Sequence, residues 1–426
     1  MNRWAHRILF ALPALLILFL YGSTLHTIGF LSDDWDLLER VRGAPFYMPI
    51  ENHHYNLFIN FLFKQVTLGN LSPAGIHLIA IAGHFINTYL VFLIARKGFS
   101  QNFTVASGTS LLFAVSPAGV EAIVWCCAIG YIATTFWILL AVYFFTQQHR
   151  YNPLYYVLIQ LCAFACWDWG MLVFPALVVM TIFYQTSTSR KERLIAILPL
   201  GVCWITVLVL KKVFGFSMGY AINSPLVFLK NFFSAPFVTL LPEFSKEFYQ
   251  SSIGIGAALL LLTALLIYSL RNPVARVALA LFFVCQLPQA ALGHPQSRYA
   301  YVAIFPLCFA VILVGKDLFT QFKMKRGAVL TILCLGALYS IWTHDRVTLW
   351  KEGFIQMHAL RSEIGALAEG KEEIIVLNLP DRFGPENKIW LPQGWRNGRI
   401  LFPPSITFYN TPDSPSGLKI IGISDL

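Results

Sequence analysis

Long apolar segments, separated by short segments that carry charge, follow one another from about residue 8 to residue 343. A helix needs about 20 apolar residues to cross a hydrocarbon core of about 30 Å, and about eleven segments approach this length. They lie near residues 8–29, 72–95, 102–118, 120–146, 152–167, 169–186, 193–213, 251–270, 275–293, 299–315 and 326–343. Because lipid offers the backbone no hydrogen-bond partner, each segment must pair its own amides and is therefore helical. The pattern predicts an all-α polytopic membrane protein.

The composition agrees with lipid as the solvent of these segments. Of the 426 residues, 57% are hydrophobic and 12% are charged, and the mean hydropathy is +0.63, whereas soluble domains carry about 25% charged residues. We assign the net charge of +10 mostly to cytoplasmic loops that face anionic lipid, and no nucleic-acid-binding pattern accompanies it. All eight cysteines lie in apolar segments without a zinc-ligand spacing, so we interpret them as packing residues.

Lysine and arginine residues in the short loops predict the orientation, because cytoplasmic loops carry an excess of positive charge. Arg3 and Arg7 place the N-terminus in the cytoplasm, and most later basic loops fall on the same side. The outer face then holds residues 30–71, 214–250, 294–298 and 344–426. We predict a multi-pass protein of a bacterial inner membrane with a periplasmic C-terminus.

Two parts of different character are predicted. Residues 1–343 form the transmembrane module, whose first outer loop, 30–71, is long and polar. Residues 344–426 begin with an amphipathic helical stretch and continue into an apolar strand near 373–380. We predict that they form a small periplasmic α/β appendage.

Acidic residues follow the first apolar segment directly, in the sequence Ser32-Asp33-Asp34-Trp35-Asp36. Carboxylates at a boundary between water and lipid can act as a general base on a hydroxyl or bind a divalent metal ion. The alternative interpretation is an N-cap for a short interfacial helix that runs through Glu39, with acidic residues favoured in its first turn.

Two further acidic residues are predicted at outer turns. Glu121 lies in the first turn of the predicted helix 120–146, with Trp125 one turn deeper, and stabilisation of the helix dipole is the alternative explanation. Asp168 lies between Trp167 and Trp169, where it either contributes to a site or caps the next helix, while the tryptophans suit an interfacial belt.

Basic and histidine residues complete the predicted outer site. Arg298 and Tyr299 lie where an outer loop meets a late helix, and a guanidinium suits bidentate binding of phosphate. Lys211 and Lys212 depart from the orientation rule and add outward positive charge. Snorkelling to lipid headgroups is the alternative for all these cations.

The histidines fall into two groups. His53 and His54, in the first outer loop, are placed to assist a base or to join the acids at a metal ion. His77, His84 and Asn87 share one face of the second helix, which predicts hydrogen bonding between helices more than catalysis.

The order of these motifs resembles the GT-C glycosyltransferases, and within them the transmembrane O-mannosyltransferases that usually carry tetratricopeptide repeats. The resemblance rests on the acid pair, on Ser116-Pro117 through Glu121-Ala122-Ile123-Val124-Trp125, on Ser297-Arg298-Tyr299-Ala300-Tyr301 and on Arg346 through Trp350. The chain departs from that branch at Ser116, where histidine is usual, at Trp167-Asp168, where Lys-Glu is usual, and in lacking the repeats.

The resemblance implies an inverting transfer of a sugar from a polyprenyl-phosphate carrier to an acceptor hydroxyl. Asp33 or Asp34 would be the base, Glu121 a second acid near the acceptor or a metal, and Arg298 the partner of the lipid phosphate. No cofactor is implied beyond a divalent metal ion as an alternative use of the acids. The rival hypotheses are a transporter or flippase of lipid-linked saccharides, which predicts charged residues at mid-membrane, and an inactive scaffold that binds partners.

Overall fold

The computed structural model describes residues 3–31, 33–43, 45, 47, 56–147, 152–184, 189–213, 224–241, 251–291, 297–321 and 325–368, together with five short strands between 374 and 422. The first half of the chain forms α1 (Arg3–Tyr21), α2 (Thr24–Thr27), α3 (Asp33–Gly43), α4 (Leu57–Thr67), α5 (Pro73–Leu93), η1 (Ile94–Gly98), α6 (Phe103–Ala114), η2 (Pro117–Gly119), α7 (Val120–Val124), η3 (Cys126–Ala128), α8 (Ile129–Thr146), α9 (Pro153–Cys166), η4 (Asp168–Leu172), α10 (Val173–Phe183) and α11 (Arg190–Val213).

The second half forms α12 (Pro225–Leu240), α14 (Ser252–Arg271), α15 (Pro273–Ala291), α16 (Ser297–Gln321) and α17 (Lys325–Ala368). Five strands follow: β1 (Ile374–Leu377), β2 (Arg382–Phe383), β3 (Ile389–Trp390), β4 (Ile406–Tyr409) and β5 (Lys419–Gly422). β1 pairs in parallel with β4 and antiparallel with β5, and β2 pairs antiparallel with β3. The strand predicted near 373–380 is confirmed as β1, while the placement of the tail at a membrane face stays a prediction.

Seven helices among the described residues are long and apolar enough to cross a membrane, or eight if α6 and the bent segment after it form one span. The chain is therefore a multi-pass membrane protein with an all-α membrane region. α9, α10 together with η4, and α12 are apolar but shorter, so the count of about eleven spans stays a prediction.

The sequence pattern missed α12, because residues 214–250 were expected to form an outer loop. Lys230, Asn231 and Pro236 interrupt the apolar pattern there. In the structure α12 packs against α14, α15 and α16, and Thr239 Oγ1 accepts a hydrogen bond of 2.9 Å from Gln286 Nε2 of α15. The polar residues of α12 thus find partners on a neighbouring helix, which hydropathy alone does not reveal.

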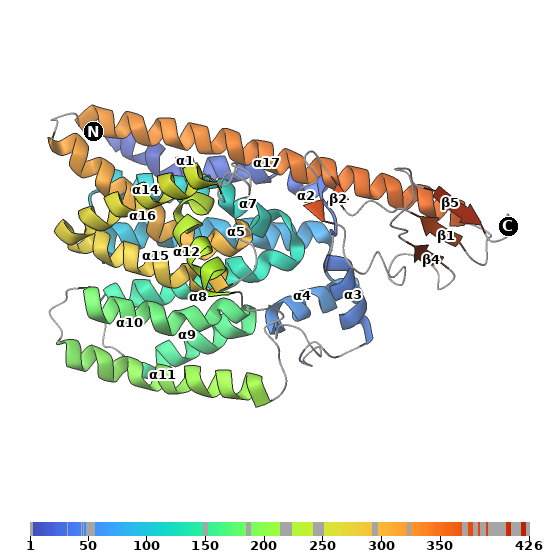
Figure 1. The fold of residues 1–426 in the computed structure, drawn as a ribbon, viewed down its shortest axis with the longest axis horizontal. Coiled ribbons are helices and arrows are strands. Elements are labelled where there is room, and N and C mark those ends of the chain that lie inside the picture. The colour runs from blue at the N-terminus through green and yellow to red at the C-terminus, as the bar shows by residue number, and fades with distance from the viewer. Residues whose placement is uncertain are drawn as a thin grey trace.

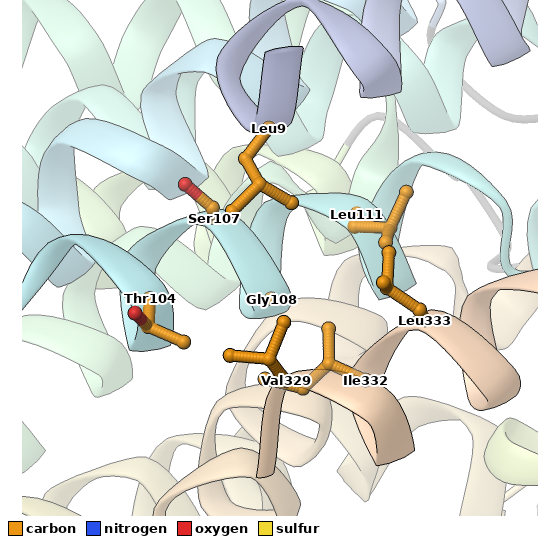
Figure 2. A pocket seen from close by; sticks show the side chains of 8 residues that line it. All are labelled: Leu9, Thr104, Ser107, Gly108, Leu111, Val329, Ile332 and Leu333. Atoms are coloured by element: carbon orange, nitrogen blue, oxygen red, sulfur yellow. The ribbon is translucent and has the colours of Figure 1, made fainter. Parts of the chain in front are cut away.

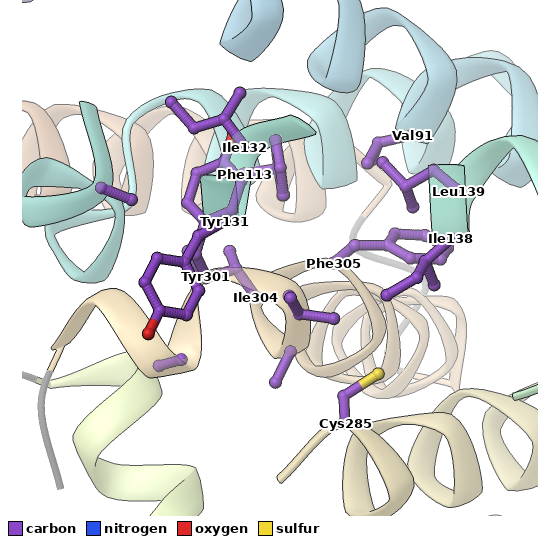
Figure 3. Packing of buried hydrophobic residues seen from close by; sticks show 14 of the residues in the cluster. Val91, Phe113, Tyr131, Ile132, Ile138, Leu139, Cys285, Tyr301, Ile304 and Phe305 are labelled. Carbon is purple, nitrogen blue, oxygen red and sulfur yellow. The ribbon is translucent and has the colours of Figure 1, made fainter. Parts of the chain in front are cut away.

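α16 forms the centre of the bundle and packs against α15, α6, α8 and α12 (Figure 1). Every side chain from Tyr299 to Ala310 is buried, as expected of a helix that is apolar on all sides. Figure 3 shows Tyr301 and Phe305 of α16 among side chains of the surrounding helices, including Ile138 and Leu139 of α8. α11, at one edge of the bundle, instead exposes a row of aliphatic side chains suited to lipid.

A buried polar network joins four helices, which confirms the predicted role of His84 and Asn87. His84 Nε2 lies 3.0 Å from the carbonyl oxygen of Ala114, and because a carbonyl only accepts, Nε2 carries the proton. His84 Nδ1 therefore accepts from the Tyr301 hydroxyl at 2.7 Å. Asn87 Nδ2 donates to the Ile132 carbonyl at 2.9 Å and lies 3.4 Å from the Tyr301 hydroxyl oxygen. The network fixes α5 against α6, α8 and α16.

α17 continues without a break across the predicted domain boundary at residue 343, and Figure 1 shows it along α1 to the strands of the tail. Against α1 and α6 it borders a small, mainly apolar pocket (Figure 2). A Cβ added at Gly108 of α6 would lie 2.9 Å from Ile332 Cδ1 of α17, so the glycine allows the close approach of the two helices. The division into 1–343 and 344–426 stays a prediction.

We expect Tyr301→Phe to lower the free energy of unfolding by about 1–3 kcal/mol, because it leaves buried His84 Nδ1 without its donor. The measurement is thermal unfolding of the purified protein in detergent. Tyr155→Phe is the matched control, since Tyr155 is 60% exposed on the bundle surface. Equal stability of the two variants would contradict the assigned network.

Candidate active site

The described part of residues 30–71, where the sequence suggested a polar loop, contains two short helices, α3 and α4. Lys64 Nζ of α4 donates to the carbonyl oxygens of Val41 and Arg42, at 2.9 and 3.1 Å. A lysine at the carboxyl end of a helix satisfies carbonyls that lack intrahelical partners and favours the helix dipole. α3 begins at Asp33, as the N-cap interpretation anticipated, and is held against α4 at one end of the bundle (Figure 1).

Asp34 lies in the first turn of α3 and is completely buried. Its Oδ2 accepts from the backbone N–H of Leu31 at 2.8 Å, and its Oδ1 accepts from the backbone N–H of Cys127 at 2.7 Å. A carboxylate that accepts backbone N–H groups makes strong, charge-assisted hydrogen bonds. Asp34 therefore ties the segment after α1 to residues that lie 93 positions further along the chain.

The predicted single helix over 120–146 is wrong, because the chain leaves the helix at Trp125. α7 ends at Val124, Trp125 has an extended backbone (φ −105°, ψ 116°), and α8 begins only at Ile129. The break frees the Cys127 amide for Asp34 and turns the Trp125 indole so that Nε1 lies 3.3 Å from the Leu31 carbonyl oxygen. Irregular backbone at a membrane edge is tolerated where protein groups satisfy it in this way.

Glu121 and Arg298, 177 positions apart in the sequence, form an ion pair between Oε1 and Nη1. Glu121 Oε2 also accepts from Ser297 Oγ at 2.6 Å and from the Arg298 backbone N–H at 3.2 Å. The pair is partly buried, with 15% of the Arg298 side chain and 14% of the Glu121 side chain exposed. Glu121 thus does more than stabilise a helix dipole: it fixes the beginning of α16 and the position of the guanidinium.

Aromatic rings surround the Arg298 guanidinium. Its central carbon lies 4.6 Å from the ring centroid of Trp125 and 4.9 Å from that of Tyr299, distances at which a cation is attracted to an aromatic face. Tyr299 in turn packs against Trp169 and Tyr131, with ring centroids 5.4 and 5.8 Å apart. The cluster connects α16, α8 and the turn that carries Asp168.

The turn between α9 and α10 places Asp168, which is buried with 2% exposure, beside this aromatic cluster. Gly170 allows the turn, because an added Cβ would lie 2.3 Å from the carbonyl carbon of Ala163 and 2.4 Å from the nitrogen of Phe164. The Gln160 side chain holds the turn from within α9, since Nε2 donates to the Gly170 carbonyl at 2.7 Å. Asp168 is thus part of a rigid, closely packed corner.

In the structure Arg298 pairs with Glu121 and packs against Tyr299. Trp125 contacts both Arg298 and the Leu31 carbonyl oxygen, and so connects the pair to the segment of Asp34. Asp168 lies in the turn of Trp169, whose ring packs against Tyr299. His53, His54 and the side chains of Asp33, Lys211 and Lys212 lie outside the described residues. The sequence interpretation did not assign roles to Ser297, Trp125 or Trp350, although all three belong to the motifs that carried the family resemblance. No group of three or more histidine, cysteine, aspartate or glutamate side chains suited to a metal ion occurs in the described segments.

We expect Gly170→Ala to destabilise the protein by at least about 1–3 kcal/mol, because the added methyl group overlaps backbone atoms that cannot move away. Gly256→Ala is the control, since an added Cβ there meets no atom within 4 Å and alanine favours a helix interior. The apparent melting temperatures of both variants in detergent are compared. If both match the wild type, the close packing of the turn is wrong.

No protein-family profile matches the sequence, and no curated protein sequence matches it. Among solved structures, ArnT from Cupriavidus metallidurans, crystallised with undecaprenyl phosphate, is similar with a TM-score of 0.51 and 11% sequence identity, over 87% of this chain and 83% of ArnT. The arabinofuranosyltransferase AftD from Mycobacteria gives a TM-score of 0.48 and 11% identity, over 96% of this chain and 32% of AftD. The likeness to ArnT shows that the chain shares the fold of that protein over most of its length.

Proposed function

We propose that the protein is an inverting glycosyltransferase that moves a sugar from a polyprenyl-phosphate carrier to an acceptor hydroxyl. The observation that carries the proposal is the convergence of the Asp34 segment on the Glu121–Arg298 pair through Trp125. The fold shared with ArnT, whose crystal structure holds undecaprenyl phosphate, supports a polyprenyl-linked donor. The motif resemblance to transmembrane O-mannosyltransferases supports a hydroxyl acceptor.

We assign the general base to Asp33. Asp34 is buried and both its carboxylate oxygens accept backbone N–H groups, so its role is to hold the segment after α1 in place. Asp33 precedes Asp34 in the first turn of α3, so the hydrogen bonds of Asp34 also fix the backbone of Asp33. In the proposed step the acceptor oxygen transfers its proton to the Asp33 carboxylate while it attacks the anomeric carbon of the donor.

The bond from the anomeric carbon to the phosphate oxygen breaks in the same step, and its electron pair leaves with polyprenyl phosphate. The leaving phosphate gains negative charge, which Arg298 stabilises as it develops, so no proton donor is required. Because Glu121 already balances the charge of Arg298, a donor phosphate needs further positive charge. We assign this charge to Lys211 and Lys212, at the end of α11.

The remaining predicted residues line or support the substrate site in this proposal. Tyr299 lies against the Arg298 guanidinium, Asp168 belongs to the turn of Trp169, which packs on Tyr299, and His53 and His54 belong to the segment between α3 and α4. We place the reaction on the periplasmic face of a bacterial inner membrane, because the loops with excess positive charge lie at the other end of the predicted topology.

Asp33→Asn is expected to lower sugar transfer by roughly 10²–10⁴-fold, the usual contribution of a general base, and to leave the melting temperature unchanged. Asp34→Asn is expected to destabilise the protein by about 1.5–3 kcal/mol, because an amide cannot accept both backbone N–H groups as a carboxylate does. The assay follows release of polyprenyl phosphate from a panel of labelled polyprenyl-phosphate sugars, with purified protein in nanodiscs and acceptor from a membrane extract.

The wild-type assay decides between a glycosyltransferase and a flippase of lipid-linked sugars. Transfer that depends on Asp33 establishes the enzyme and identifies the donor. If no donor is turned over and lipid-linked sugars instead cross the bilayer of proteoliposomes, the protein is a flippase. If Asp33→Asn keeps full activity, the protein is still a glycosyltransferase, but Asp33 is not its general base.

The role of Arg298 is tested in the same assay. We expect Arg298→Gln to lower kcat by roughly 10²–10³-fold, comparable to the loss of one donor that stabilises developing negative charge. Arg298→Lys keeps the charge but loses the planar fork, so its kcat should fall between those of the wild type and the glutamine variant. If the glutamine variant retains the wild-type kcat, Arg298 serves the fold and not the leaving group.

A further inference from the structure

The part of α17 from Thr343 onward contacts segments that lie next to Asp34 and Glu121. Thr343 Oγ1 donates to the Val115 carbonyl at 2.8 Å, directly before the bend that leads to Glu121. Further along, Lys351 Nζ donates to Ser23 Oγ at 2.6 Å, between α1 and α2. Figure 1 shows this part of α17 passing α2 at the end of the bundle that carries α3 and α4.

Two aromatic contacts bring α17 to the site itself. Trp350 packs against Trp125, with ring centroids 6.0 Å apart and an interplanar angle of 33°. One helical turn later, Phe354 lies against Gly29, where a Cβ would come within 3.0 Å of the phenyl ring. Gly29 precedes Leu31, whose amide binds Asp34 and whose carbonyl oxygen lies near the Trp125 indole.

We infer that Trp350 is a positioning residue, through which α17 holds Trp125, and with it the Arg298 guanidinium, against the segment that carries Asp33 and Asp34. The Trp125 ring contacts both Trp350 and Arg298, so displacement of the ring moves the charge. Trp125 caps the end of α7: its amide donates to the Glu121 carbonyl at 3.3 Å, but its backbone is extended and the helix stops there. The position of the indole therefore depends on its contacts with Leu31, Arg298 and Trp350, and Trp350 is the one that comes from α17.

The inference rests on the proposed function and concerns how the donor phosphate is bound. An enzyme whose Arg298 is misplaced binds the phosphate less well and stabilises its developing charge less well, so kcat falls and the donor KM and the dissociation constant for undecaprenyl phosphate rise. A residue that only stabilises the fold lowers the amount of active protein, which reduces the apparent kcat and leaves both constants unchanged. The two roles therefore differ in a measurable way.

The experiment compares the wild type with Trp350→Leu, Trp350→Ala and Trp350→Phe in nanodiscs. Undecaprenyl phosphate binding is measured by titration, and the donor KM is measured in the transfer assay. We expect the leucine and alanine variants to raise both constants about two- to tenfold, the equivalent of one aromatic pair, and the phenylalanine variant to restore most of the loss. Leucine keeps apolar volume, so it serves if the alanine variant fails to fold. Ile355→Ala is the control, because Ile355 is 60% exposed on the same helix.

A coupled variant tests whether Trp350 acts through Arg298. In an Arg298→Gln background, Trp350→Leu should not weaken undecaprenyl phosphate binding further. The inference is wrong if the Trp350 variants leave both constants unchanged, or if their losses add fully to that of Arg298→Gln. The proposed function still holds in either case, provided that the wild type is active. If the wild type neither binds undecaprenyl phosphate nor transfers sugar, the function and the inference fall together.

Discussion

The ion pair between Glu121 and Arg298 is the interaction around which this end of the bundle is organised. A charged side chain at the edge of the hydrocarbon region is unfavourable unless it is paired or reaches water. Here each charge is the main partner of the other, and Ser297 and the first amide of α16 supply further hydrogen bonds to the carboxylate. The pair fixes where α16 begins, and α16 in turn packs against α15, α6, α12 and α8.

This pairing requires the chain to leave the helical conformation between α7 and α8. A continuous helix would use the Cys127 amide within the helix and would carry the Trp125 ring in another direction. The break instead gives that amide to Asp34 and brings the indole beside Arg298. A local loss of helix hydrogen bonds is thus offset by contacts with the segment after α1, so two loops far apart in the sequence form one surface.

α17 connects this end of the bundle to the C-terminal part of the chain. Its N-terminal part packs on α1 and α6, where Gly108 permits close contact, and from Thr343 onward it reaches Val115, Trp125 and Gly29. A single rigid helix that touches the bundle and both site segments couples them mechanically. The same helix ends at Ala368, shortly before β1 begins at Ile374.

The sequence by itself determined the membrane character of the chain, most of its helices and the residues with chemical potential, because hydropathy and the local positions of Glu121 and Arg298 are properties of short segments. It did not predict α12, whose polar residues become acceptable only beside their partners on α15. It also did not distinguish Asp33 from Asp34, since burial of Asp34 depends on an amide 93 positions away. The tertiary structure alone decided that Glu121 and Arg298 pair, that the helix breaks at Trp125 and that Trp350 meets it. These are contacts between distant segments, and their energies depend on packing that no local pattern encodes.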